Sequence, residues 1–166
     1  MSETTDLTTK QFFLETCMGI EGLCAEMYHF YSRIYEDIPE ASSLWKKTAL
    51  EEENHQKQFE MALRLLDEIE FEVPKDSLER ALSIHDKLLK LMDHIKRDRP
   101  DLLTAVSKAL VMEDKLADLH VHTSLNFKEA SMQKLFKALS EADRDHVADM
   151  QRYQSILYLP QSEMQG

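Results

Sequence analysis

The chain has 166 residues, of which 43% are hydrophobic and 31% are charged, and its formal net charge is -11. This composition is typical of one globular domain and not of a disordered chain. The negative charge argues against nucleic acids and anionic membrane surfaces as partners, because both attract basic patches. No apolar run approaches the roughly 20 residues of a membrane span, and the polar N-terminal segment has no apolar core of a signal peptide.

The numbers of cysteine and glycine residues indicate the redox setting and the fold class of the chain. Cys17 and Cys24 are the two cysteines, and on one helix they would lie roughly 10 Å apart, which is too far for a disulfide. We therefore expect a reducing, cytoplasmic setting. Only three glycines and four prolines are present, and no glycine-rich loop for a nucleotide phosphate occurs. The chain is predicted to be all-α, with proline marking the breaks.

Five segments carry apolar residues at steps of three and four, the spacing of one helix face. A shorter segment begins at Asp76 or Ser77, either of which can cap a helix. Pro39 suits the first turn of the second long helix. The breaks read "EDIPEAS", "FEVPKDS" and "KRDRPD", and the four long helices are expected over Thr9–Asp37, Glu40–Glu70, Pro100–Asn126 and Lys128–Tyr158.

The order of these segments predicts an architecture. Short breaks make neighbouring helices antiparallel, and the shorter helix lies in the connection between the second and third long ones. Those two long helices would then run parallel, joined by a long crossover. We expect a single domain over residues 1–166, a four-helix bundle whose crossover contains the extra helix, with flexible tails at 1–8 and 160–166.

Six polar side chains fall on or beside the apolar stripes. Carboxylates are almost never fully buried unless they are paired or bind metal. Two carboxylate-x-x-His pairs occur, and each follows a helix with one inward carboxylate, by 31 residues in the first half and 30 in the second. A single such pair is explained equally well by a solvated helix face. The repeat instead favours an internal duplication of a helical hairpin, in which each hairpin supplies three metal ligands. The six predicted ligands are Glu21, Glu52, His55, Glu113, Asp143 and His146.

The residue types indicate the chemistry of this set. Four carboxylates carry a charge of about -4, which two divalent cations would neutralise. We expect the single carboxylates Glu21 and Glu113 to bridge the metals, with each carboxylate-x-x-His pair supplying terminal ligands. Oxygen donors with one nitrogen per metal favour iron or manganese, and zinc less specifically. The neighbouring Glu51 and Glu53 are expected to be solvated.

Four segments, "GIEGLCAEMYHFYSRI", "ALEEENHQKQF", "ALVMEDKLADLH" and "LSEADRDHVADM", occur in this order. Together they resemble the ferritin-like superfamily, and within it the rubrerythrin-like di-iron carboxylate proteins. The resemblance implies a ferritin-like bundle, with Asp143 at a ligand position that glutamate usually holds. It also places Tyr28, seven residues after Glu21, where it would orient a ligand carboxylate, and His120 in the corresponding place of the other half.

The sequence departs from rubrerythrins in three ways. Asp143 is one methylene shorter than glutamate, and Leu116 and Ala117 stand where rubrerythrins carry an extra carboxylate. No CxxC pair occurs, so the chain has no rubredoxin domain to deliver electrons.

The resemblance implies a function in oxidative-stress defence or iron handling. Two iron ions, with manganese or zinc as alternatives, would react with peroxide or dioxygen, supplied with electrons by an external donor. We expect a homo-oligomer, a dimer, while a peroxidase- or ferroxidase-type activity stays open. Two other hypotheses remain open as well: iron storage without turnover, and a helical interaction module with a structural metal site.

Overall fold

The computed structural model describes residues 7–159, and these form five helices and no strand. The all-α prediction is therefore confirmed. Helix α1 includes Leu7 and Thr8, which we expected to belong to the N-terminal tail. The other residues of the two predicted tails, 1–6 and 160–166, lie outside the described residues. The helices are α1 (Leu7–Ile34), α2 (Pro39–Arg64), the shorter α3 (Ser77–Arg97), α4 (Leu102–Asn126) and α5 (Ala130–Leu157).

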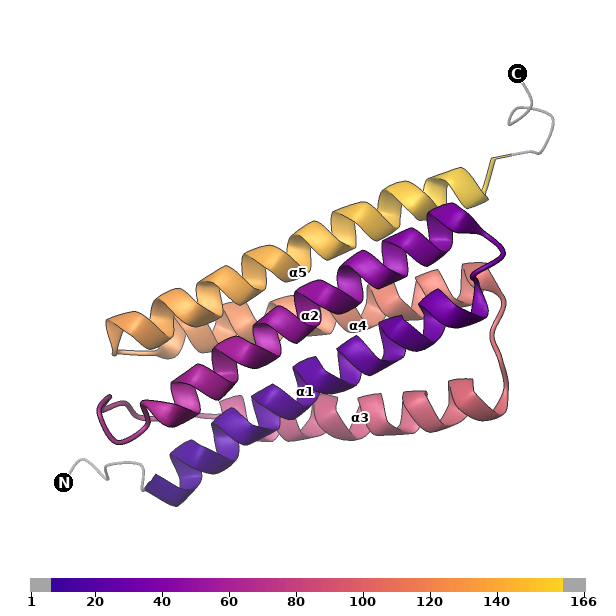
Figure 1. Cartoon of the computed structure of the whole chain (residues 1–166). Helices are drawn as coiled ribbons and strands as arrows, with labels where there is room; N and C mark the ends of the chain where they lie inside the picture. Colours follow the sequence, from indigo (N-terminus) through magenta and orange to yellow (C-terminus); the bar gives the residue numbers. More distant parts are fainter. Residues whose placement is uncertain (1–6, 160–166) are drawn as a thin grey trace.

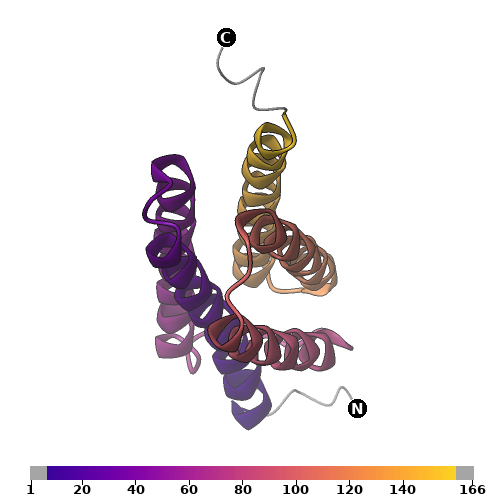
Figure 2. The same cartoon turned by 90° about the vertical axis from the view of Figure 1, so that its right-hand side faces the viewer.

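Two antiparallel hairpins make up the bundle (Figure 1). Helices α1 and α2 form one hairpin, and α4 and α5 form the other. The crossover between the hairpins contains α3, which packs mainly against α1, so α2 and α4 run in the same direction as expected. The end-on view shows the two hairpins facing each other, with α3 at one edge (Figure 2). This arrangement turns one stripe of each long helix toward a shared interior.

Local sequence signals account for the starts of α2 and α4. Proline occupies the first turn of α2, where its missing N–H costs no hydrogen bond. Helix α4 begins at Leu102 instead of Pro100, because the side chain of Asp101 accepts a 2.8 Å hydrogen bond from the backbone N–H of Thr104. Asp76 precedes α3 with a positive φ of 69° and makes no side-chain cap.

The end of α2 was predicted wrongly. The helix stops at Arg64, six residues before the expected Glu70. Phe71 is buried, and its ring packs edge-on against Phe127 with 5.7 Å between the centroids. Phe127 directly follows α4, so the chain beyond α2 packs Phe71 at the end of that helix. Tertiary packing here overrides the helical pattern of the local sequence.

The apolar core has two aromatic regions. Phe13 belongs to a group of stacked and tilted phenylalanine rings, and Tyr28 stacks on Trp45 at 5.6 Å. Along α1, Glu21 lies between Phe13 and Tyr28. The interior position of Glu21 is therefore enclosed by aromatic side chains in both directions along its helix. Within residues 7–159 no helix combines the length and apolarity needed to cross a membrane.

Candidate metal centre

All six predicted ligands lie in the interior of the bundle. Helix α1 supplies Glu21, α4 supplies Glu113, and α2 and α5 each supply a carboxylate and a histidine. The four carboxylate side chains are fully buried, and the two histidines are at most 8% exposed. The structure therefore brings together the whole set predicted from the sequence, from four different helices.

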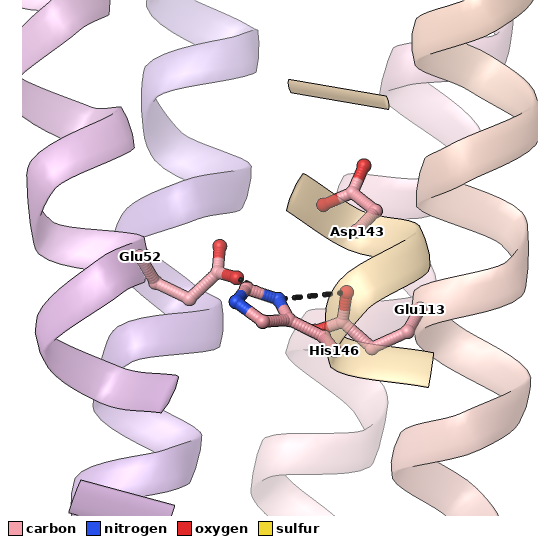
Figure 3. A group of neighbouring side chains, drawn as sticks. All are labelled: Glu52, Glu113, Asp143 and His146. Atoms are coloured by element: carbon pink, nitrogen blue, oxygen red, sulfur yellow. Dashed lines mark hydrogen bonds and ion pairs between the residues drawn. The ribbon is translucent and has the colours of Figure 1, made fainter. Parts of the chain in front are cut away.

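One group of possible ligands combines Glu52, Glu113, Asp143 and His146. Each offers one donor atom, and these atoms all lie within 4.8 Å of one another. The Nδ1 atom of His146 lies 3.0 Å from Oε1 of Glu52 and 3.4 Å from Oε2 of Glu113 (Figure 3). This spacing is close enough for one ion to contact all four side chains after small adjustments.

A second group combines Glu21, Glu52 and His55, under the same 4.8 Å limit. The Nδ1 atom of His55 lies 3.7 Å from Oε2 of Glu21 and 3.7 Å from Oε2 of Glu52. Glu52 thus belongs to both groups, with Oε1 near one histidine and Oε2 near the other. The geometry therefore offers two groups that could each hold a metal ion and that share one carboxylate.

The shared carboxylate differs from the sequence-based expectation. Glu21 and Glu113 were expected to bridge the metals, but each falls in a single group. One oxygen of Glu113, Oε1, accepts a 2.5 Å hydrogen bond from the hydroxyl of Tyr28, a residue that belongs to neither group. Glu52 has the central position between the two histidines, which makes it the bridging candidate.

Tyr28 and His120 occupy matching places in the two hairpins, as predicted. Tyr28 reaches across to Glu113 of the other hairpin. His120 is buried, with its Nε2 3.5 Å from Glu21 Oε1 and its Nδ1 2.5 Å from Asp143 Oδ2. The short Asp143 side chain is therefore anchored by an imidazole from α4. Tyr28 thus holds a carboxylate of the other hairpin, whereas His120 holds Asp143 of its own hairpin and approaches Glu21 of the other.

Glu51 was missed at the sequence level. It was expected only to be solvated, but its Oε2 lies 2.5 Å from Nε2 of His146 on α5. Glu53, also expected to be solvated, contacts His29 on α1 at 2.5 Å. Spacing along α2 could not reveal either contact, because both partners come from other helices.

Several buried nitrogen and oxygen atoms of the six predicted ligands have no hydrogen-bond partner, and they show whether a metal ion suits this cluster. Both carboxylate oxygens of Glu21 and of Glu52, Oδ1 of Asp143, and Nδ1 of His55 are buried and make no hydrogen bond. Leaving ionised oxygens buried and unpaired costs several kcal/mol per group. Divalent cations bound by oxygen with one imidazole nitrogen each would satisfy these atoms, so the donor set fits two metal ions.

Three of the four carboxyl groups resist ionisation, whereas at Glu52 burial is outweighed by contacts with Glu21, His146 and His55, which lower its pKa. Burial, followed by the charge of Glu52, raises the pKa of Glu21 to about 7. Burial and the charges of Glu21 and Glu52 raise the pKa of Asp143 well above its ordinary value. Burial also raises the pKa of Glu113, although hydrogen bonds from His146 and Tyr28 offset part of the shift. Glu21, Glu113 and Asp143 therefore need protons or cations to compensate their charge, while Glu52 is the carboxyl that ionises most readily.

The two candidate ligand histidines show the complementary effect. Burial lowers the pKa of His146, but the carboxylates of Glu113 and Glu52, 3.4 and 3.0 Å from its Nδ1, outweigh that effect and raise the pKa to about 12. For His55, Glu21 and Glu52 overcome burial in the same way and raise the pKa to about 10. The positive charge that these imidazoles then carry compensates part of the charge of the neighbouring carboxylates.

Comparison of the chain with protein-family models, curated proteins and solved structures finds no match. The buried cluster and its place in the helical bundle therefore carry the functional inference without support from a relative.

Proposed function

We propose that this protein is a di-metal carboxylate protein of the ferritin-like, rubrerythrin-like type. It would bind two iron ions and react with peroxide or dioxygen. The observation that carries the proposal is the pair of buried donor groups that share Glu52, with six donor residues drawn from four helices. A buried cluster of four carboxylates and two histidines has no benefit for folding unless cations neutralise it.

The residues divide into two ligand sets. Glu113, Asp143 and His146 would hold one ion, Glu21 and His55 would hold the other, and Glu52 would bridge them. Two divalent cations balance the formal charge of the four carboxylates. Iron, when bound, supplies one-electron redox chemistry toward peroxide or dioxygen, and manganese or zinc would fit the same oxygen and imidazole donors.

The chain itself contributes orientation and exclusion of water. The Tyr28 hydroxyl holds Oε1 of Glu113, which leaves Oε2 on the side of His146. Tyr28 is in turn clamped by its stacking on Trp45, with the ring planes 11° apart. Such a supported donor fixes the direction of a ligand carboxylate. Electrons for turnover would come from an external donor.

The test is metal analysis of protein produced with iron available, followed by anaerobic reduction and a peroxide challenge. We expect two irons per chain and rapid oxidation monitored by absorption. His55→Ala and His146→Ala should each lower the iron content, whereas His29→Ala, a control on α1 outside the donor groups, should keep it. Wild-type protein that binds no metal would refute the proposal.

The same experiment separates the two alternatives. Iron-loaded protein that is inert to both oxidants would indicate a structural metal site. Slow accumulation of many irons per chain, in a shell-sized particle by light scattering, would indicate storage.

A further inference from the structure

The two histidines of the donor groups are held differently. His146 presents its two ring nitrogens to opposite partners: Nδ1 faces Glu52 and Glu113, and Nε2 lies 2.5 Å from Oε2 of Glu51. His146 is 2% exposed, whereas the side chain of Glu51 is 41% exposed. Glu51 therefore reaches from the surface of α2 across to α5 and contacts the outer edge of a buried imidazole.

Glu51 is itself held at the surface. Its Oε1 lies 3.9 Å from the ammonium of Lys47, one turn earlier on α2. Lys47 is also 3.7 Å from Asp149 on α5. This small network spans the seam between the two helices on the outer side of His146.

His55 has no equivalent support. Its Nδ1 faces Glu21 and Glu52 at 3.7 Å each, but its Nε2 contacts no carboxylate within residues 7–159. Its group also offers three donor residues, against four in the group of His146. Asp143 in the larger group has the additional contact with His120. The two candidate metal positions thus differ both in ligand number and in how firmly the ligands are held.

We propose that the two metal positions are unequal, and that Glu51 is the positioning residue that makes the His146 position the tighter one. This inference rests on the proposed function, because it concerns the same site. Glu51 accepts the Nε2–H of His146, which leaves the lone pair on Nδ1 pointing at the metal position. A carboxylate in this place fixes the tautomer and ring orientation and makes the ligand nitrogen more basic. The His146 position fills first, and the His55 position fills second and exchanges more readily.

The test is equilibrium titration of the metal-free protein with Co²⁺, followed by visible absorption, which reports the ligand geometry of each bound ion. Wild-type protein is expected to bind two ions in two steps. Glu51→Ala weakens the first step about 10- to 100-fold and leaves the second unchanged. Glu51→Gln, which keeps an acceptor oxygen without the charge, gives an intermediate loss and retains the wild-type spectrum of the first ion.

Glu53→Ala is the matched control. Glu53 lies on the same helix, has a side chain 40% exposed and also contacts a histidine at 2.5 Å, but that histidine is His29, outside both groups. The control keeps both steps. His55→Ala abolishes the second step and keeps the first, which assigns the steps to the two positions.

Three outcomes overturn the inference while leaving the proposed function intact. They are two ions bound with equal affinity, a first step that Glu51→Ala leaves unchanged, and a first step that is lost in His55→Ala. A metal-free wild-type protein that binds no Co²⁺ overturns the inference and the proposed function together.

Discussion

Glu21→Gln removes one buried negative charge while keeping the size of the side chain. We expect this change to stabilise the metal-free protein at pH 8 and to weaken metal binding. Glu21 is fully buried, and burial together with the charge of Glu52 raises its pKa from 4.5 to about 7. The ionised form is therefore less favourable in the folded protein than in the unfolded chain.

The magnitude follows from linkage between protonation and folding. Because the pKa is raised on folding, the stabilisation from Glu21 is fully present below pH 4.5 and is lost as the pH rises through about 7. At about 1.36 kcal/mol per pH unit, this loss is roughly 3 kcal/mol at pH 8. Glutamine avoids it, but imperfect hydrogen bonding of its amide costs about 1–2 kcal/mol. The net gain of about 1–2 kcal/mol corresponds to a rise in Tm of about 2–8 °C.

Calorimetry of both proteins at pH 5 and pH 8, without and with Co²⁺ or Fe²⁺, checks this expectation. The variant should have the higher Tm at pH 8 without metal and lose that advantage at pH 5, where Glu21 of the wild type is protonated. Added metal should reverse the order, because a bound ligand stabilises only the protein that binds it. The reasoning would be refuted if Glu21→Gln melted below the wild type at pH 8 without metal, or if metal raised both Tm values equally.

Three further changes test other parts of the structure. Tyr28→Phe leaves a buried oxygen of Glu113 without its hydrogen-bond donor, so the free energy of unfolding should fall by about 1–3 kcal/mol. Urea titration measures this loss, and an unchanged midpoint would contradict the 2.5 Å hydrogen bond. Asp101→Ala removes the cap at the start of α4 and should cost about 0.5–2 kcal/mol, with Asp98→Ala, beyond α3, as the control. Metal-loaded protein should release its ions as the pH falls, because carboxylates and imidazoles bind metal only after losing protons. Dialysis at decreasing pH with metal analysis measures this release, and retention of both ions below the ordinary carboxyl pKa would argue against these ligands.

The spacing of residues along the chain was sufficient to predict the inward face of each long helix. Apolar steps of three and four identified the five helices, and the i, i+3 relation of Glu52 to His55 placed both on one face. The long crossover predicted that α2 and α4 run parallel, as the structure has them. These features depend on helix periodicity and loop length, which are local properties of a sequence.

Tertiary structure alone decided which atoms meet between helices. Glu52 is shared by the two donor groups, and the Tyr28 hydroxyl reaches Glu113, because the two hairpins face each other at one particular rotation and height. Beyond the end of α2 at Arg64, Phe71 packs against Phe127, which directly follows α4 and is likewise distant in the sequence. Glu51 contacts His146 from a position that local periodicity assigns to solvent. Helix periodicity determines which way a side chain points, but the distance to a partner on another helix is set only when the bundle packs.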